Sequence, residues 1–475
     1  EVGVVLVGEI HHLPHLGMRV VGFLDSDPAT HGRTLGGIKI LGSPADVTQH
    51  VTRYQVDTVL IPTPAVSTRE VRALVTACTA ADVKVQVVPG FDALLRGTLT
   101  VEPRDVDIQD LLCREPVRLD GQAVERFLLG RVVLVTGAAG SIGSEICRQV
   151  LAFRPERLVL LDHSENGLFH VERELRGLAC GTEVVSCVAS VTDARRLRTV
   201  FARHRPAVVF HAAAHKHVPM MEANPGEAVK NNVFGTRTLV DESIRCGVQA
   251  FVMISTDKAV KPTSVMGTTK RLAELYVQAL SERADTRLVT VRFGNVLGSN
   301  GSVVPLFKEQ IRNGGPVTVT HPEMTRYFMT IPEASQLVLQ AGAQGRGGEI
   351  FVLDMGEPVR VLDLARDMIR LSGLEEGREI EIAFTGLRPG EKLHEELYDQ
   401  DEERVPTPHP KIFAVRRSPC AVEWLRDEFD HLARVLEGPA EEVIEALGRL
   451  VPTYRPAELP GRCSRIEEPS GLVPR

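Results

Sequence analysis

The feature that most restricts the fold of this chain is a glycine-rich stretch at 137–143, which reads Gly-Ala-Ala-Gly-Ser-Ile-Gly. It directly follows the apolar run at 131–136 and precedes residues 144–153, whose composition suits a helix. A glycine turn alone is common, but one between a strand and a helix gathers backbone amides at a positive helix end. The next apolar run, 157–162, ends in Asp162. This order of elements predicts a doubly wound parallel α/β sheet.

The same turn predicts what the sheet binds. Glycine has no side chain, so Gly137, Gly140 and Gly143 let backbone amides approach a pyrophosphate. Asp162 stands where a carboxylate accepts hydrogen bonds from two ribose hydroxyls, and its charge repels a 2′-phosphate. NAD is therefore favoured over NADP, and the alternative is a structural turn beside a surface Asp. The predicted cofactor residues of this unit are Gly137, Ala139, Gly140, Ser141, Ile142, Gly143 and Asp162.

Apolar runs alternate with helix-length polar segments along most of the chain, which is typical of parallel sheets with crossover helices. After a boundary near 120–130, strands are predicted at 131–137, 157–162, 183–188, 207–211, 250–254 and 288–293. Helices are predicted in the more irregular part that follows, at 331–341, 361–372, 421–436 and 440–450. Before the boundary, a smaller α/β unit has predicted strands at 4–8, 19–25, 56–61 and 83–88.

The first two of these strands are separated by only about ten residues, fewer than a parallel crossover needs. Either they do not form a βαβ pair, or the glycine loop and helix expected between them are missing from this chain.

The composition argues against several partners and sites. A chain of 475 residues is too long for one ordinary core, and 43% hydrophobic with 25% charged residues is typical of a soluble globular protein. A net charge of −7 gives no reason to expect nucleic acid or an anionic membrane as a partner. The eight cysteines are scattered without a CxxC pair, so we predict no disulfide framework and no metal site. We find no apolar run of about 18 residues that predicts a membrane span.

Five motifs, in order, resemble one known family. They are TGAAGSIGSE, HAAAHKHVPMMEANPGEAVKNN, STDKAVKPTSVMGTTKR, RFGNVLGSNGSV and GLRPGEKLHEEL, and the resemblance covers roughly residues 115–415. They resemble the extended short-chain dehydrogenase/reductases. More narrowly, they resemble the nucleotide-sugar 4,6-dehydratases of bacterial polysaccharide biosynthesis, the UDP-N-acetylglucosamine 4,6-dehydratase group. The first ~115 residues resemble the extra Rossmann-like domain of that group's long members.

The resemblance implies an organisation. We expect an N-terminal Rossmann-like domain of unknown role, a NAD-binding catalytic domain, a mainly substrate-binding region, and C-terminal helices with a tail, at 1–115, 116–297, 298–415 and 416–475. The tail ends in Leu-Val-Pro-Arg, which reads as half of an engineered protease site. Long members carry N-terminal transmembrane helices, so we expect a soluble portion of a protein anchored at the cytoplasmic side of the bacterial inner membrane. We also expect a UDP-sugar substrate and a homo-oligomer.

The implied reaction needs an acid and a base. A 4,6-dehydratase passes a hydride from C4 of the hexose to NAD, removes the C5 proton and the C6 hydroxyl, and returns the hydride to C6. By resemblance, Asp257 is the acid at C6 and Lys258 the base at C5, and both follow a predicted strand. Lys258 can act as a base only if its pKa falls well below ~10.4, and we expect desolvation to lower it. The alternative is a structural ion pair in a loop.

Met266 occupies the position at which the superfamily has a catalytic Tyr, four residues before Lys270. A thioether neither gives nor takes a proton, although the long-form dehydratases also carry Met here. We therefore expect Asp257 to take the C4 hydroxyl proton and Thr256 to hydrogen-bond the C4 oxygen. We expect Lys270 to hold the nicotinamide ribose hydroxyls.

The resemblance also implies contacts to the sugar nucleotide. The amide of Asn295 meets the diphosphate, Arg388 clamps a phosphate, and Glu391 accepts hydrogen bonds from a ribose. Lys216 and His217 follow a strand end and line the sugar pocket. The alternatives are a turn, a surface ion pair or the start of a helix.

Two further positions complete the expected cofactor site. Ala212 and Ala213, at the end of the strand predicted at 207–211, are expected to contact the cofactor. Ser190 stands where relatives offer an Asp to the adenine, so adenine recognition falls to Asp193 or to the backbone.

Three rival functions remain. A dehydratase that also inverts C5 uses the same Asp-Lys pair, so the sequence separates it only weakly. A 4-epimerase normally uses the Tyr that Met266 replaces and has no need of Asp257 and Lys258. A non-catalytic nucleotide-binding sensor would explain Met266 as a lesion, but not the retention of Asp257, Lys258 and Lys270.

Overall fold

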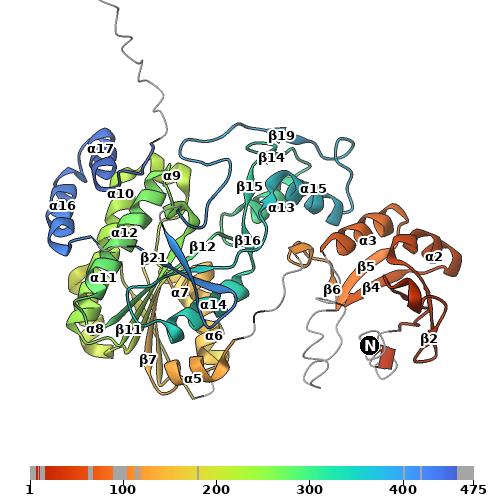
Figure 1. Ribbon diagram of the computed structural model, residues 1–475, viewed down its shortest axis with the longest axis horizontal. Coiled ribbons are helices and arrows are strands. Elements are labelled where there is room, and N and C mark those ends of the chain that lie inside the picture. The colour runs from red at the N-terminus through yellow and green to blue at the C-terminus, as the bar shows by residue number, and fades with distance from the viewer. Residues whose placement is uncertain are drawn as a thin grey trace, which may run out of the picture.

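The computed structural model of the chain describes residues 7–8, 10, 17–62, 68–88, 104–112, 117, 119–178, 181–399, 402–417 and 420–456. Two α/β units lie apart along the long axis, and the smaller one is N-terminal (Figure 1). The segment that carries α13 (Val303–Arg312) and α15 (Val361–Leu371) lies between them.

The larger unit is built on a mostly parallel sheet. Among the described residues it has nine strands, in the order β20-β21-β17-β12-β11-β10-β7-β8-β9. Every neighbouring pair from β17 to β9 is parallel, and β21 and β20 add an antiparallel edge. The chain order reverses between β7 and β10, where open α/β sheets bind their ligands. The strands are β7 (Val132–Thr136), β8 (Arg157–Asp162), β9 (Glu183–Val188), β10 (Val208–His211), β11 (Ala250–Thr256), β12 (Arg287–Phe293), β17 (Ile350–Leu353), β20 (Glu403–Pro406) and β21 (Ile412–Arg416).

Both faces of this sheet are covered by helices. Successive side chains of a strand point to opposite faces, so Leu134 of β7 enters one apolar cluster while Val133 and Val135 enter the other. Continuous apolar runs are therefore needed in the central strands. The helices of the Leu134 cluster are α8 (Ala194–His204), α9 (Val218–Glu222), α10 (Pro225–Val229), η5 (Lys230–Phe234), α11 (Gly235–Arg245), α12 (Val265–Ser281), α16 (Val422–Val435) and α17 (Ala440–Leu450). Those of the other cluster are α5 (Gly121–Leu128), α6 (Ser141–Leu151), α7 (Glu165–Leu178) and α14 (Ile331–Gln344).

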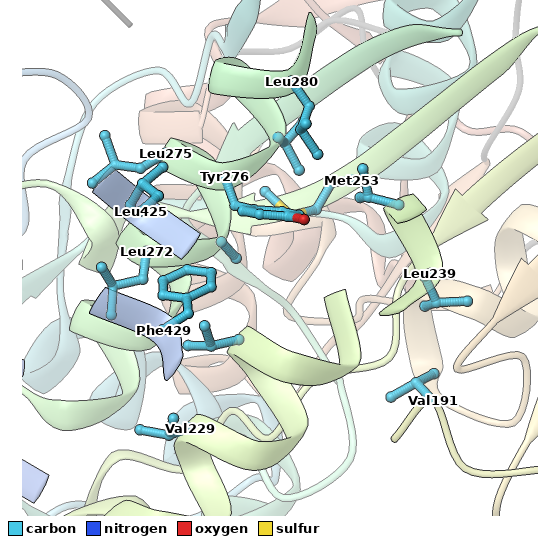
Figure 2. Packing of buried hydrophobic residues seen from close by; sticks show 14 of the residues in the cluster. Val191, Val229, Leu239, Met253, Leu272, Leu275, Tyr276, Leu280, Leu425 and Phe429 are labelled. Atoms are coloured by element: carbon cyan, nitrogen blue, oxygen red, sulfur yellow. The ribbon is translucent and has the colours of Figure 1, made fainter. Parts of the chain in front are cut away.

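Helix α12 is buried along almost its whole length. The C-terminal helix α16 packs on it, and Figure 2 shows Leu272, Leu275 and Tyr276 of α12 beside Leu425 and Phe429 of α16. The rings of Tyr276 and Phe429 stack with their centroids 5.4 Å apart. Such a pair stabilises the fold by about 0.5–1.5 kcal/mol in addition to the free energy gained from the apolar area that it buries. The C-terminal helices therefore hold α12 firmly against the sheet.

Most predicted elements of this unit are confirmed. The predicted bounds of β8, β9 and α17 are those observed, and other ends shift by a few residues. The sheet strands β17, β20 and β21 were not predicted, because they are short runs in a stretch rich in Gly and Pro. None of the helices in the described part of the chain is long and apolar enough to cross a membrane.

The smaller unit differs from the prediction at its start. The strand predicted at 4–8 lies largely outside the described residues, and residues 7–8 are helical. The strand predicted at 19–25 is reduced to β1 (Phe23–Leu24), because its parallel partner β3 reaches only these two residues. The later strands β4 and β5 form the predicted parallel pair, with α3 as the crossover. The elements here are β2 (Thr34–Leu35), β3 (Ile38–Gly42), β4 (Thr58–Pro62), β5 (Lys84–Val88), β6 (Arg104–Asp105), α2 (Val47–Tyr54), α3 (Thr68–Ala80) and the short 3-10 helices η2 (Pro28–Thr30), η3 (Pro44–Asp46) and η4 (Asp110–Leu112).

The N-terminal unit docks on the segment between the two units. Val71 and Leu74 of α3 share an apolar cluster with Met368 of α15 and Phe307 of α13. Beside it, Nη2 of Arg72 forms an ion pair of 2.9 Å with Oδ2 of Asp367, whose side chain is buried. The remaining strands of this segment are β13 (Asn295–Val296), β14 (Val317–Val319), β15 (Thr325–Arg326), β16 (Phe328–Met329), β18 (Val359–Arg360) and β19 (Ile382–Phe384).

Candidate active site

A cavity of about 1350 Å³ opens where β7, β10, β11 and β12 end, between the sheet and α13. Most of the predicted site residues line it: Gly137, Gly140, Ser141, Ile142, Gly143, Ala212, Lys216, His217, Thr256, Lys258, Met266, Lys270, Asn295, Arg388 and Glu391. Five others are not in its wall, namely Ala139, Asp162, Asp193, Ala213 and Asp257. The fold thus gathers all five sequence motifs around one cavity.

The glycine turn between β7 and α6 tolerates no side chain at two positions. Gly137 has a φ of 67°, and a Cβ there would lie 2.6 Å from the backbone nitrogen of Ala213. A Cβ on Gly143 would lie 2.0 Å from the carbonyl oxygen of Gly137. Both contacts are with backbone, which cannot move aside. The turn therefore presents bare backbone at the N-terminus of an eleven-residue helix, which fits the pyrophosphate of a dinucleotide.

Asp162 stands beside this turn at the end of β8. The backbone N–H of Ala139 donates to its Oδ2 over 3.1 Å, and that of Ser164 donates to its Oδ1 over 2.9 Å. These bonds fix the carboxylate while each oxygen keeps a lone pair for a further donor. The arrangement fits a ribose diol next to the glycine turn.

Asp193 has a structural role in the protein. It is the N-cap of α8, and its carboxylate accepts a hydrogen bond of 2.9 Å from the backbone N–H of Arg196. A capping Asp satisfies a helix amide that otherwise has no partner. The hydroxyl of Ser190 forms a hydrogen bond of 2.7 Å with the hydroxyl of Thr192.

Asp257 and Lys258 lie directly after β11, in the 3-10 helix η6 (Asp257–Ala259). The side chain of Asp257 is fully buried, and its Oδ1 accepts hydrogen bonds from Oγ1 of Thr256 (2.8 Å) and from Nζ of Lys258 (3.0 Å). Its Oδ2 has no hydrogen-bond partner among the described residues. A buried carboxylate oxygen without a donor is costly, so its retention calls for an explanation such as a catalytic role or a bound water.

The charge state of Lys258 differs from the sequence-based expectation. Burial by itself would lower the pKa of Lys258, but the negative charges of Asp257 and Glu395 outweigh it, and the net pKa is raised. The expected decrease is therefore not observed, because the ammonium group lies between two carboxylates. Nζ of Lys258 also donates a 3.0 Å hydrogen bond to Oδ1 of Asn295. Asn295, predicted to meet a diphosphate, here positions the lysine.

Met266 and Lys270 share the cavity-facing start of α12, one helical turn apart. Both are buried, with 3% and 5% of their surface exposed. Burial lowers the pKa of Lys270 to about 8, although the charge of Glu274 acts in the opposite direction. The thioether of Met266 belongs to the main apolar cluster, so it packs where a phenol would otherwise stand.

Lys216 and His217 line the cavity just after β10. Nζ of Lys216 donates to Oγ of Ser299 over 3.3 Å, and burial lowers the pKa of this lysine. Burial, with the charges of Lys216 and Arg388, also lowers the pKa of His217. The histidine therefore favours its neutral form beside two cations.

Arg388 and Glu391 bind each other in the cavity wall. Nε and Nη2 of Arg388 donate to Oε1 of Glu391 over 3.1 and 2.6 Å. The glutamate side chain is largely buried, whereas the guanidinium is half-exposed. The pair thus presents a positive group toward solvent and the cavity, as recognition of a phosphate requires.

Sequence reasoning missed a carboxylate in the same cavity. Glu395 lines the wall, and its Oε1 lies 3.7 Å from Nζ of Lys258 and 4.0 Å from Nε of Arg326. The motif GLRPGEKLHEEL contains this residue, but its neighbour Glu396 points outward to Lys261. The sequence has no signal that separates these two adjacent glutamates. No group of three or more His, Cys, Asp or Glu within the described ranges could hold a metal ion.

Several known proteins resemble this chain. The probable polysaccharide biosynthesis protein EpsC of Bacillus subtilis is 48% identical over 395 residues, which are 82% of this chain and 66% of that protein. The chain thus spans about two thirds of that relative's length. A UDP-glucose 4-epimerase of Rickettsia canadensis is 34% identical over 281 residues (58% of this chain, 80% of that protein). A UDP-N-acetylglucosamine 4,6-dehydratase (inverting) of Campylobacter jejuni is 30% identical over 294 residues (61% and 84%).

The fold is also that of a solved structure. The X-ray structure of Pen from Bacillus thuringiensis is 31% identical and has a TM-score of 0.57, covering 64% of this chain and 98% of that one. Residues 3–89 match the family model of a CoA-binding domain. Residues 133–417, more than half of the chain, match the model of polysaccharide biosynthesis proteins. With the doubly wound sheet and all five motifs around one cavity, the chain belongs to the polysaccharide biosynthesis protein family.

Proposed function

We propose that this chain catalyses the NAD-dependent 4,6-dehydration of a UDP-N-acetylhexosamine, with UDP-N-acetylglucosamine as the substrate. The observation that carries the proposal is the ion pair between Lys258, which lines the same cavity as the glycine turn, and the fully buried Asp257. An acid and a base side by side suit removal of a proton and a hydroxyl from adjacent carbons. The relative from Campylobacter jejuni bears the name of such a dehydratase.

The residues of the glycine turn fit NAD. Gly137, Gly140 and Gly143 would hold the pyrophosphate, Asp162 the adenosine ribose, and Lys270 the nicotinamide ribose. When bound, NAD supplies reversible hydride transfer, which takes a hydride from C4 and returns it at C6. Ala139, Ser141 and Ile142 belong to this turn, and Ala212 and Ala213 lie against Gly137. Asp193 caps α8, and adenine recognition by it stays a prediction.

In this proposal Asp257 transfers a proton from the C4 hydroxyl of the substrate to its C6 hydroxyl. Its unpartnered Oδ2 accepts the proton of the C4 hydroxyl, and Thr256 hydrogen-bonds the C4 oxygen. The protonated Asp257 then gives that proton to the C6 hydroxyl, which leaves as water. One residue thus serves two steps, and the phenol that Met266 replaces is not required.

Lys258 takes the proton from C5 and returns a proton to C5 when the hydride reaches C6, so that its amine is neutral again after each turnover. Oxidation at C4 makes this proton acidic, and a neutral lysine amine then accepts it. The lysine must first lose the proton that Asp257 and Glu395 stabilise on it. Arg388, Glu391, Lys216 and His217 would bind the UDP-sugar on the other side of the cavity.

Two alternative reactions share this machinery. Inversion at C5 requires that the proton return to the opposite face, and the relative from Campylobacter jejuni is named as inverting. A 4-epimerase would need only the steps at C4, and a relative from Rickettsia canadensis bears that name. Met266 in place of an acidic phenol, together with Lys258, favours dehydration.

Mass spectrometry of the sugar nucleotide tests the proposal. The protein, with its NAD content measured, is incubated with UDP-N-acetylglucosamine. We expect a product lighter by one water. An unchanged mass, with substrate binding verified by calorimetry, would refute dehydration, and an unchanged mass with altered C4 configuration would establish the epimerase.

A further inference from the structure

Three oxygen atoms surround the ammonium group of Lys258. Oδ1 of Asp257 and Oδ1 of Asn295 each lie 3.0 Å away, and Oε1 of Glu395 lies 3.7 Å away. These acceptors come from η6, β13 and the segment after β19, so the lysine joins three parts of the fold. Asp257 has its own step in the proposed function, whereas Glu395 enters it only through the charge that it stabilises on Lys258.

The segment that carries Glu395 is tied to the catalytic strand end. Arg326 donates from Nη2 to the carbonyl of Lys392 (2.9 Å) and from Nη1 to that of Leu393 (3.2 Å). Nζ of Lys392 in turn donates to the carbonyl of Val260, just after η6, over 2.8 Å. These bonds turn Glu395 inward, where only 3% of its side chain is exposed.

The carboxylate of Glu395 is buried among charged groups. Its Oε2 is buried without a hydrogen-bond partner among the described residues. The charged groups that face it are Lys258 and Asp257 from η6, Arg326 from β15, and Lys392 from its own segment. Burial raises the pKa of Glu395, and the charge of Asp257 adds to this, while the three cations oppose it.

We infer that Glu395 is a positioning residue for Lys258, which it holds at the cavity wall in the protonated ammonium form. An anion within 4–6 Å favours the charged form of a lysine and makes its proton harder to remove. Glu395 therefore sets how readily Lys258 gives up its proton. Its role at C5 rests on the proposed function, whereas its control of the charge on Lys258 does not.

Trace labelling with acetic anhydride measures this control directly, because only the neutral amine reacts. The holoprotein and its Glu395→Gln variant are labelled across a range of pH, and the peptide that contains Lys258 is quantified by mass spectrometry. We expect the labelling midpoint of Lys258 to fall by about 1 pH unit or more in Glu395→Gln. The matched control is Glu396→Gln, which changes the adjacent outward carboxylate beside Lys261 and should leave the midpoint unchanged.

An identical midpoint in the wild type and in Glu395→Gln would overturn the inference. If Glu395→Gln does not fold, Glu395→Asp is used instead. The shorter side chain keeps the negative charge but places it farther from Lys258, so the labelling midpoint of Lys258 should fall by less than the shift expected for Glu395→Gln. An unchanged midpoint in that variant again overturns the inference.

The pH dependence of turnover separates this inference from the proposed function. If the wild type releases water, the acid limb of its kcat profile should move to lower pH in Glu395→Gln, with KM changed less than twofold. If the wild type releases no water while the labelling midpoint still shifts, the proposed function fails and the positioning role stands. If the wild type releases water but Glu395→Gln changes neither the acid limb of the kcat profile nor the labelling midpoint of Lys258, the positioning role is refuted and the proposed function stands.

Discussion

Nζ of Lys258 lies 3.0 Å from Oδ1 of Asp257, so the proposed base and the proposed acid form an ion pair across adjacent residues. Oδ2 of Asp257 has no hydrogen-bond partner among the described residues, and the proposed function assigns the proton of the C4 hydroxyl to it. The lysine keeps its proton while both carboxylates beside it are charged. Proton transfer in this site therefore depends on a small number of buried charges.

Asp257→Asn tests whether one carboxyl group serves both hydroxyls. An amide of the same shape cannot accept the C4 proton, so we expect water release to fall by roughly 10²–10⁴-fold. The absorbance of the bound nicotinamide should stay constant after substrate addition. An absorbance change without water release would assign the C4 proton to another group and leave Asp257 only the C6 step. Calorimetry with the UDP-sugar serves as the binding control.

Met266→Leu tests whether the thioether has a chemical role. Leu keeps the apolar volume at a buried position, and such swaps usually cost less than about 1.5 kcal/mol of stability. Because sulfur transfers no proton here, kcat should stay within about threefold of the wild type, a difference of under ~1 kcal/mol in the barrier. Steady-state kinetics provide the check. A loss of two orders of magnitude would mean that Met266 takes part in catalysis.

Gly143→Ala should disrupt the turn that we assign to NAD. The new Cβ would lie 2.0 Å from the carbonyl oxygen of Gly137, a backbone atom. We expect a loss of about 1–3 kcal/mol in the free energy of unfolding, with a lower NAD content. The matched control is Gly177→Ala in α7, where a Cβ meets no atom within 4 Å. That variant should change the free energy of unfolding by no more than about 1 kcal/mol and keep its NAD.

Lys270 should make stability depend on alkaline pH. Its pKa is lowered from 10.5 to about 8 by burial, so between these values the unfolded chain binds more protons than the folded protein. The free energy of unfolding therefore rises with pH across this window, by about 3 kcal/mol from this group. Lys270→Met should lack that rise. Chemical unfolding of both proteins at the two ends of the window gives the difference, and parallel curves would contradict the assignment.

The contact between the N-terminal unit and α15 should be energetically significant. Arg72 and Asp367 pair over 2.9 Å, and the Asp side chain is only 9% exposed. A double-mutant cycle to Ala should give a coupling of about 0.5–3 kcal/mol. In the same helix, Arg366 pairs with Glu376 over 2.9 Å at the surface and serves as the control. That pair should couple by no more than about 1 kcal/mol, and equal couplings would argue against a firm docking of the unit.

The sequence allowed the sheet to be predicted where its strands are continuous apolar runs. β8 is buried along nearly its whole length, and the edge strand β9 has a buried residue on each face between its exposed ends, so both are recognisable without knowledge of their partners. β20 and β21 lie in an irregular stretch, where β21 pairs antiparallel with β17 and β20 pairs antiparallel with β21 at the edge of the sheet. The short β1 shows the reverse case, in which an apolar run lacks a partner strand along most of its length.

The site could be predicted by residue type but not by charge state. The motifs that contain Asp257, Lys258 and Asn295 line or adjoin the cavity, because each follows a strand of the sheet. The raised pKa of Lys258 comes from the charge of Asp257 and then from that of Glu395, whose inward direction depends on bonds between Arg326 and distant backbone carbonyls. Such tertiary contacts have no local pattern in the sequence.

Transfer of a label from C4 to C6 tests directly whether the hydride removed from C4 returns at C6. UDP-N-acetylglucosamine carrying deuterium at C4 is incubated with the holoprotein, and the product is analysed by mass spectrometry and NMR. We expect a product that has lost one water and carries the deuterium on C6, since the hydride removed from C4 returns within the same site. A product that retains all its oxygen, or one whose C6 carries no deuterium, would refute the proposed dehydration.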